Sequence, residues 1–99
     1  MPKLTVRRPH NSDPQAILSK VGTALESTAK EFDATDVQLS NSGNSSTFSF
    51  KTMGFTIGGD VQATSNEVVV NVDLPMAAMP FQSVAEQVIG RNVDAAISS

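Results

Sequence analysis

Apolar residues recur at every second position from residue 36 to residue 74, and this pattern constrains the fold more than any other feature of the sequence. Three short breaks, at residues 41–46, 53–54 and 65–66, divide the pattern into four runs. Each break contains glycine or asparagine. A period of two is typical of strands with one buried face, and breaks of this kind are typical of tight turns. The stretch therefore predicts four consecutive antiparallel strands.

The pairing of these strands follows from the lengths of the turns. A two-residue loop between the last two strands places Val61 opposite Val70. The same loop length between the two middle strands places Phe48 opposite Gly59, where an aromatic ring covers the backbone that a strand glycine exposes. In both pairings every apolar residue falls on one face of the sheet. Since a shift of one residue would turn each apolar set outward, this agreement favours an antiparallel meander.

One strand and one helix precede the meander. Leu4 and Val6 alternate with polar neighbours, which predicts a short, half-buried strand. Apolar residues at helical spacing then predict a helix over about residues 13–32. Ser12 followed by Gln15 three residues later fits a capping box at the start of that helix.

A second helix follows the meander. A broad apolar stripe predicts it over residues 77–97, with its regular part starting at Pro80, because proline is tolerated in the first turn of a helix. The element order β-α-β-β-β-β-α predicts an α+β fold, in which both helices cover the apolar face of a sheet of about five strands. We expect the first strand to pair with the fifth, which gives the strand order 1-5-4-3-2. The length of 99 residues is typical of one domain, so residues 1–99 are expected to form a single domain.

Composition restricts the classes of function. The sequence contains no cysteine, which excludes disulfides, thiolate metal sites and cysteine nucleophiles. No apolar run reaches the roughly 20 residues needed to span a bilayer, and no secretory signal follows the N-terminal charges, so we expect a cytoplasmic protein without a transmembrane segment. The net charge is −3, and the only basic cluster, Lys3, Arg7 and Arg8, has no aromatic residues interleaved with it. These features argue against a nucleic-acid partner.

Several residues mark the boundaries between the predicted elements. They are Pro9 and His10 before the first helix, Phe48 and Phe50 in a strand, Gly54, Gly58 and Gly59 in a hairpin, Leu74 and Pro75 at the end of the last strand, and Met79, Pro80 and Phe81 at the start of the last helix. With these residues in this order, nearly the whole chain resembles the small bacterial family of putative polyhydroxyalkanoic acid system proteins, found near polyester-granule loci. The resemblance implies a link to polyester granules and supplies no catalytic residues.

Two sets of residues are candidates for function. His10 is the only histidine; imidazole is a common acid–base group near neutral pH, but the alternative is that the ring packs or caps at the entrance of the first helix. Met76, Met79 and Phe81 form an adaptable apolar group that is a candidate ligand-binding site, although such residues also occur in cores. The glycines of residues 54–59 lack the lysine and the following helix of a phosphate loop, which argues against phosphate binding. With no cysteine and a single histidine, no metal is expected either, and no cofactor is expected.

These observations support two hypotheses of different classes. The first is a non-enzymatic accessory or binding protein that contacts an apolar small molecule, a granule surface or a protein partner through the groove between the sheet and the last helix. The alternative is a small enzyme that uses His10 as acid or base with an unidentified carboxylate. An enzyme requires His10 to lie in a concave pocket with a second polar group within hydrogen-bond distance.

Overall fold

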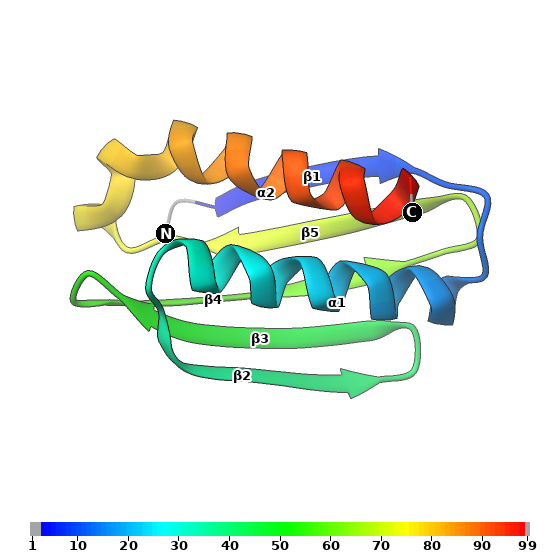
Figure 1. The fold of residues 1–99 in the computed structure, drawn as a ribbon, viewed down its shortest axis with the longest axis horizontal. Helices are drawn as coiled ribbons and strands as arrows, with labels where there is room; N and C mark the ends of the chain where they lie inside the picture. Colours follow the sequence, from blue (N-terminus) through cyan, green and yellow to red (C-terminus); the bar gives the residue numbers. More distant parts are fainter. Residues whose placement is uncertain (1–2, 99) are drawn as a thin grey trace.

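The computed structural model describes residues 3–98, which form an antiparallel sheet with two α-helices on one of its faces (Figure 1). In chain order the elements are β1 (Lys3–Pro9), α1 (Pro14–Glu31), β2 (Thr35–Ser42), β3 (Ser45–Thr52), β4 (Phe55–Ala63), β5 (Glu67–Asp73), the 3₁₀-helix η1 (Met76–Phe81) and α2 (Gln82–Ser98). The predicted α+β class and element order are confirmed.

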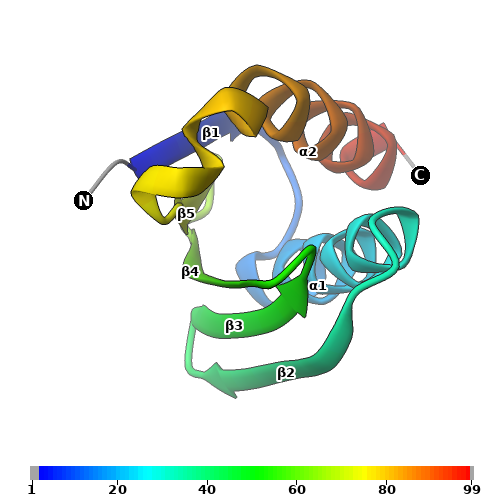
Figure 2. The same ribbon diagram turned by 90° about the vertical axis from the view of Figure 1, so that its left-hand side faces the viewer.

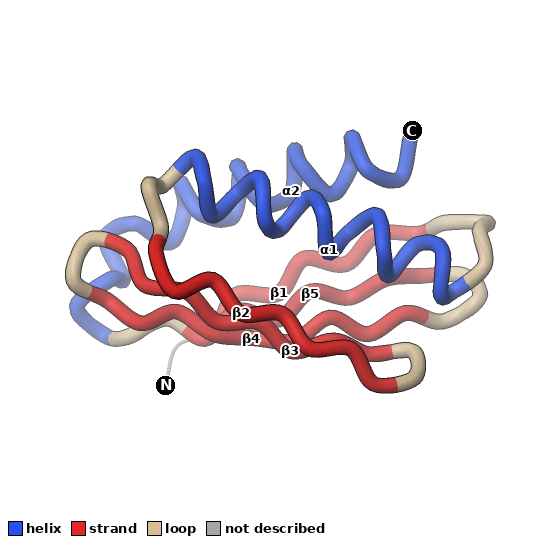
Figure 3. Tube along the Cα trace, turned by 60° about the horizontal axis from the view of Figure 1, so that its bottom comes forward, coloured by secondary structure: helices blue, strands red, loops and turns tan. Residues whose placement is uncertain are grey.

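The strand order is β1-β5-β4-β3-β2, as predicted, and every neighbouring pair is antiparallel. Val61 lies opposite Val70, and Phe48 lies opposite Gly59, so the register inferred from the turn lengths is confirmed. The first and fifth strands are far apart in the sequence but lie side by side at one edge (Figure 1). The sheet is curved, and both helices lie on its concave side (Figures 2 and 3).

The hydrophobic core lies between the concave face and the helices. Helix α1 contributes buried residues at three- and four-residue spacing, and β5 contributes every second residue. The core cluster consists of Leu4, Val6, Ile17, Leu18, Val21, Leu25, Ala29, Phe48, Phe50, Val61, Ala63, Val68, Val70, Val72, Leu74, Ile89 and Val93. The helical spacing in α1 and the alternation in β5, both predicted from the sequence, therefore place their apolar residues in one core.

Both helices begin differently from the prediction. The Asp13 side chain, not that of Ser12, caps α1: its Oδ2 accepts from the backbone N–H groups of Gln15 and Ala16 at 3.0 and 3.2 Å. The reason is that the Ser12 backbone N–H donates to His10 Nδ1, which holds Ser12 in the loop before the helix. Pro80 lies inside η1 instead of opening an α-helix, because the chain already forms a 3₁₀ turn directly after residue 75.

The edge strand β2 is less covered than its alternating pattern predicts. Leu39 pairs with Phe48 and so shares its face, yet its side chain is 37% exposed, and that of Val37 is 45% exposed. A register shift between Thr35 and Gln38 disturbs the alternation at Val37. The helices also lie mainly over the other strands, so β2 has apolar residues without a full cover.

Candidate functional site

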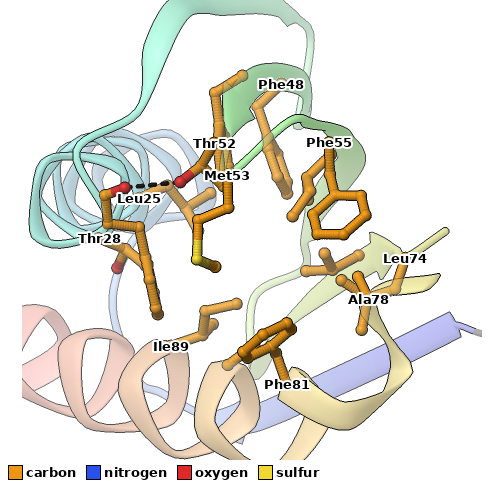
Figure 4. A pocket seen from close by; sticks show the side chains of 15 residues that line it. Leu25, Thr28, Phe48, Thr52, Met53, Phe55, Leu74, Ala78, Phe81 and Ile89 are labelled. Atoms are coloured by element: carbon orange, nitrogen blue, oxygen red, sulfur yellow. Dashed lines mark hydrogen bonds between the residues drawn. The ribbon is translucent and has the colours of Figure 1, made fainter.

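An apolar pocket lies at the end of the molecule where α1 ends and where the β3–β4 turn, η1 and the start of α2 meet (Figures 1 and 4). Its cavity volume is about 40 Å³. All five phenylalanines of the sequence line it, although they come from four different parts of the chain: Phe32, Phe48, Phe50, Phe55 and Phe81. The remaining wall is mostly aliphatic and includes Leu25, Ile57, Leu74, Ala78, Ala85 and Ile89.

Strand β3 builds one wall of the pocket. Phe48 and Phe50 lie two positions apart, so both rings project from the concave face. Their rings are nearly parallel, with an interplanar angle of 14° and centroids 6.3 Å apart. Both side chains are buried. Alternation along one strand therefore places two adjacent aromatic rings in the pocket.

The contact between the two helices positions the other walls. Asn92 Nδ2 of α2 donates to Thr28 Oγ1 of α1 at 2.7 Å, and Arg91 pairs with Glu31 at 2.9 Å. At the opposite edge, Arg8 of β1 pairs with Asp94 of α2 at 2.7 Å. The ion pairs are exposed, and such pairs contribute little to stability, but they link α2 to α1 on one side and to β1 on the other.

The polar side chains in the pocket wall are already paired. Thr28 Oγ1 donates to the Ala24 carbonyl at 2.9 Å, and Thr52 Oγ1 donates to the Phe32 carbonyl at 2.6 Å (Figure 4). None of the described residues that line the pocket is titratable. Burying an unpaired polar group costs free energy, so this pocket favours an apolar occupant over a charged one.

Met53 lies at the rim of the pocket in an unusual backbone conformation. It has a φ of 51° and the following Gly54 has a φ of 81°, because the two residues form the tight turn between the paired residues Thr52 and Phe55. Such turns favour Asn-Gly, and a non-glycine residue in this region typically costs on the order of 1–3 kcal/mol. Within residues 3–98, the other non-glycine residues with positive φ are Asp33 and Asp36, whose short polar side chains tolerate it. Met53 therefore differs from the other described residues with positive φ, which are aspartates and glycines.

The structure places the predicted ligand-binding residues in two groups. Phe81 lines the pocket and is 44% exposed at its rim. Met76 and Met79 are exposed on η1 beside the pocket and do not line it. Met53, which sequence reasoning placed in a turn, does line it. One feature of the sequence could have pointed to Met53: it is a methionine in a tight hairpin turn, where asparagine or glycine is favoured.

Exposed apolar side chains gather at the same end of the molecule. Within residues 3–98, seven large hydrophobic side chains are exposed, and two of them, Val37 and Leu39, belong to β2. The other five lie on the β3–β4 turn, η1 and the start of α2, elements that meet at one end in Figure 1. We call this set the apolar end: Met53, Met76, Met79, Phe81 and Val84.

His10 belongs to the loop between β1 and α1, which lies with the β4–β5 turn at the opposite end of the molecule (Figure 1), and its ring contacts that turn at Thr64. Its side chain is 5% exposed, and both ring nitrogens are engaged by backbone groups. Nδ1 accepts from the Ser12 N–H at 2.9 Å, so Nε2 carries the proton and donates to the Thr64 carbonyl at 2.7 Å. The ring therefore joins two loops, and neither of its nitrogens contacts a carboxylate.

Replacing His10 with alanine is expected to lower the free energy of unfolding by about 1–3 kcal/mol, because it leaves the Ser12 N–H and the Thr64 carbonyl unpaired in a buried site. Denaturation by urea, followed by circular dichroism, measures the change. His10→Asn and His10→Gln each keep a side chain that donates and accepts hydrogen bonds, so both are expected to lose less stability than the alanine variant does. An alanine variant as stable as the parent would contradict the role of His10 as a link between the loops.

The described part of the chain shows neither of two other features. Residues 3–98 contain no group of three or more side chains of His, Asp or Glu that is arranged to hold a metal ion. Among the helices of the same residues, none is both long and apolar enough to cross a membrane.

A family model described as a putative polyhydroxyalkanoic acid system protein matches residues 4–97. The chain belongs to this family. The resemblance inferred from its boundary residues is thus confirmed, and it extends over all the elements of the fold. Among curated proteins, none matches this member of the polyhydroxyalkanoic acid system family.

Two solved structures are similar to this polyhydroxyalkanoic acid system protein at low identity. The crystal structure of Ara h 8.0201 has a TM-score of 0.48 and 10% sequence identity, covering 99% of this chain and 99% of that chain. The crystal structure of TTHA0849 from Thermus thermophilus has a TM-score of 0.39 and 10% identity, covering 98% of this chain and 92% of that chain.

Proposed function

We propose that this member of the polyhydroxyalkanoic acid system family is a non-enzymatic, cytoplasmic binding protein that attaches to the apolar surface of polyester granules. The observation that carries the proposal is the pocket: all five phenylalanines converge on it, and its polar side chains are already paired. The pocket opens beside the apolar end, so a single approach to a hydrophobic surface engages both. Membership of the family supplies the link to the polyester system.

The composition of the apolar end supports a surface as the partner. Three of its five residues are methionines, whose flexible and polarisable side chains adapt to an irregular apolar surface. Contiguous exposed apolar patches on small proteins typically mark interaction sites. The opposite, convex face of the sheet carries polar and charged pairs such as Lys3–Asp73 and Arg7–Glu67, which suit contact with water. The molecule therefore has one apolar end, and the convex face of its sheet is polar and suited to contact with water.

The positions of the polar groups support binding over catalysis. An acid–base site needs a titratable group in the pocket, and the residues that line this pocket provide none. His10 lies at the other end of the molecule with both ring nitrogens bonded to the backbone. A role for His10 as a general base would require breaking at least one of these bonds.

Co-sedimentation of the purified protein with isolated polyhydroxyalkanoate granules tests the proposal. The triple variant Met76→Ser, Met79→Ser and Phe81→Ser is expected to bind at least tenfold more weakly. A tenfold loss corresponds to about 1.4 kcal/mol. At about 25 cal/mol per Å² of apolar area, that is the burial of roughly 55 Å², a small part of three large side chains.

The double variant Val37→Ser and Leu39→Ser is the matched control, because it also removes exposed apolar side chains but takes them from β2. Circular dichroism first establishes that both variants are folded. Equal binding by the triple variant and the parent would overturn the proposal, as would an equal loss in the β2 control. Retention of the parent by a protein partner but not by granules would also overturn it.

A further inference from the structure

We propose that the pocket takes the end of a single unbranched, saturated alkyl chain, and that Met53 closes over it. This inference rests on the proposed function and names the class of group that the pocket captures. Three observations carry it: the volume of the cavity, the pairing of the polar atoms in its wall, and the conformation of Met53.

The volume restricts the shape of the occupant. The cavity measures about 40 Å³. An engineered apolar cavity of about 150 Å³ binds a benzene ring. The cavity in this protein is much smaller, so it favours the narrow end of a linear chain over a ring or a branched group. In this proposal the exposed Met53 side chain shifts to admit the chain and then packs along it.

The wall restricts the polarity of the occupant. The Thr28 and Thr52 hydroxyl protons are both donated to backbone carbonyls, and the other lining side chains offer no strong hydrogen-bonding group. A carboxylate or phosphate group in the cavity would lose its hydration without gaining a hydrogen-bond donor. The anionic end of an amphipathic ligand must therefore stay at the mouth, with its alkyl end inside.

Met53 is placed to cover such a chain. Its side chain points toward the centre of the pocket from the β3–β4 turn, opposite the η1–α2 side that carries Phe81 (Figure 4). It is 57% exposed, so burial in the unliganded protein does not explain a methionine at a left-handed turn position. Contact with an alkyl chain does explain it, because a thioether side chain is long, apolar and flexible.

Titration with six-carbon alcohols tests this inference in the purified protein. Methyl NMR signals of the methionines and the denaturation midpoint report binding of 1-hexanol, cyclohexanol and 3,3-dimethyl-1-butanol. We expect 1-hexanol to bind at least tenfold more tightly than the cyclic and branched alcohols and to shift the Met53 methyl signal. Equal binding of the three alcohols would overturn the ligand class, and no binding of any of them would show that the cavity is only a packing defect.

Two variants are designed to weaken binding in the pocket without unfolding the protein. Met53→Asn supplies the residue that the turn favours, so we expect a higher denaturation midpoint together with at least fivefold weaker binding of 1-hexanol. Ala85→Leu adds a side chain from the α2 wall and is expected to abolish binding while the protein stays folded. Val37→Asn, outside the pocket, is the control with unchanged affinity. Parent-like binding by Met53→Asn would overturn the role of Met53.

Granule co-sedimentation of the same proteins distinguishes this inference from the proposed function. A parent protein that binds 1-hexanol but not granules overturns the granule function and leaves the alkyl pocket standing. Granule binding without any alcohol binding overturns the alkyl pocket and leaves the function standing.

Discussion

Replacing Phe50 with alanine is expected to lower the free energy of unfolding by about 3–5 kcal/mol, the range for truncating a buried aromatic side chain. The ring is buried and lies beside that of Phe48, so the variant loses both apolar burial and an aromatic contact. It also enlarges an existing cavity, which leaves fewer neighbours able to relax into the space. Domains of this size typically have a free energy of unfolding of about 5–15 kcal/mol, so the variant is expected to lose a large fraction of the protein's stability.

Urea denaturation followed by circular dichroism measures the effect, because the sequence has neither tryptophan nor tyrosine for fluorescence. Phe81→Ala is the matched control: it removes the same ring from the same pocket, but from a position that is 44% exposed. We expect it to cost about 1 kcal/mol or less. If Phe50→Ala has the same midpoint as the parent, the ring does not pack in the concave core.

The sheet was predictable because its information is local and redundant. Each strand alternates, each turn has a defined length, and a slip of one residue would have reversed the faces of Phe48 and Val61. The pairings Phe48–Gly59 and Val61–Val70 follow from those constraints alone. The place of β1 beside β5 followed from its short apolar alternation, which needs a sheet edge.

Two features were not predictable from the local sequence pattern: which residue caps α1, and how exposed the apolar side chains of β2 are. Both depend on residues that are distant in the sequence. Ser12 and Asp13 are both capable of capping α1, and the choice is decided by the His10 ring, which binds the Ser12 N–H and is itself held by the Thr64 carbonyl. The exposure of Leu39 depends on where the helices lie over the sheet. Alternation indicates which face a side chain points to, but not whether anything covers that face.

The candidate site was only partly predictable for a similar reason. Phe81 stood out as part of an apolar group, and it does line the pocket. Met76 and Met79 stood out equally, but in the structure they are exposed on η1, whereas Ala78 and Phe81 of the same segment line the pocket. The convergence of five phenylalanines from separate segments appears only once the topology brings the end of α1, the β3–β4 hairpin and η1 together.

Replacing Gly59 with alanine is expected to cost about 3 kcal/mol, the upper end of the usual range for overpacking. A Cβ atom at this position would lie 2.0 Å from the Asn71 carbonyl oxygen of β5 and 2.8 Å from Cζ of Phe48. The first neighbour is backbone in the centre of the sheet, so the β4–β5 pairing itself must shift to admit the methyl group. Urea denaturation measures the loss.

Gly58→Ala is the matched control, because a Cβ on the adjacent glycine meets its nearest atom, the Phe48 carbonyl oxygen, at 3.4 Å. We expect its stability to stay within about 0.5 kcal/mol of the parent. Phe48→Leu then separates the two collisions at Gly59: it removes the ring atom but leaves the Asn71 carbonyl in place. The double variant of Phe48 and Gly59 should therefore recover little of the stability lost by Gly59→Ala. Full recovery would mean that the ring, and not the approach of two strands, is what requires glycine here.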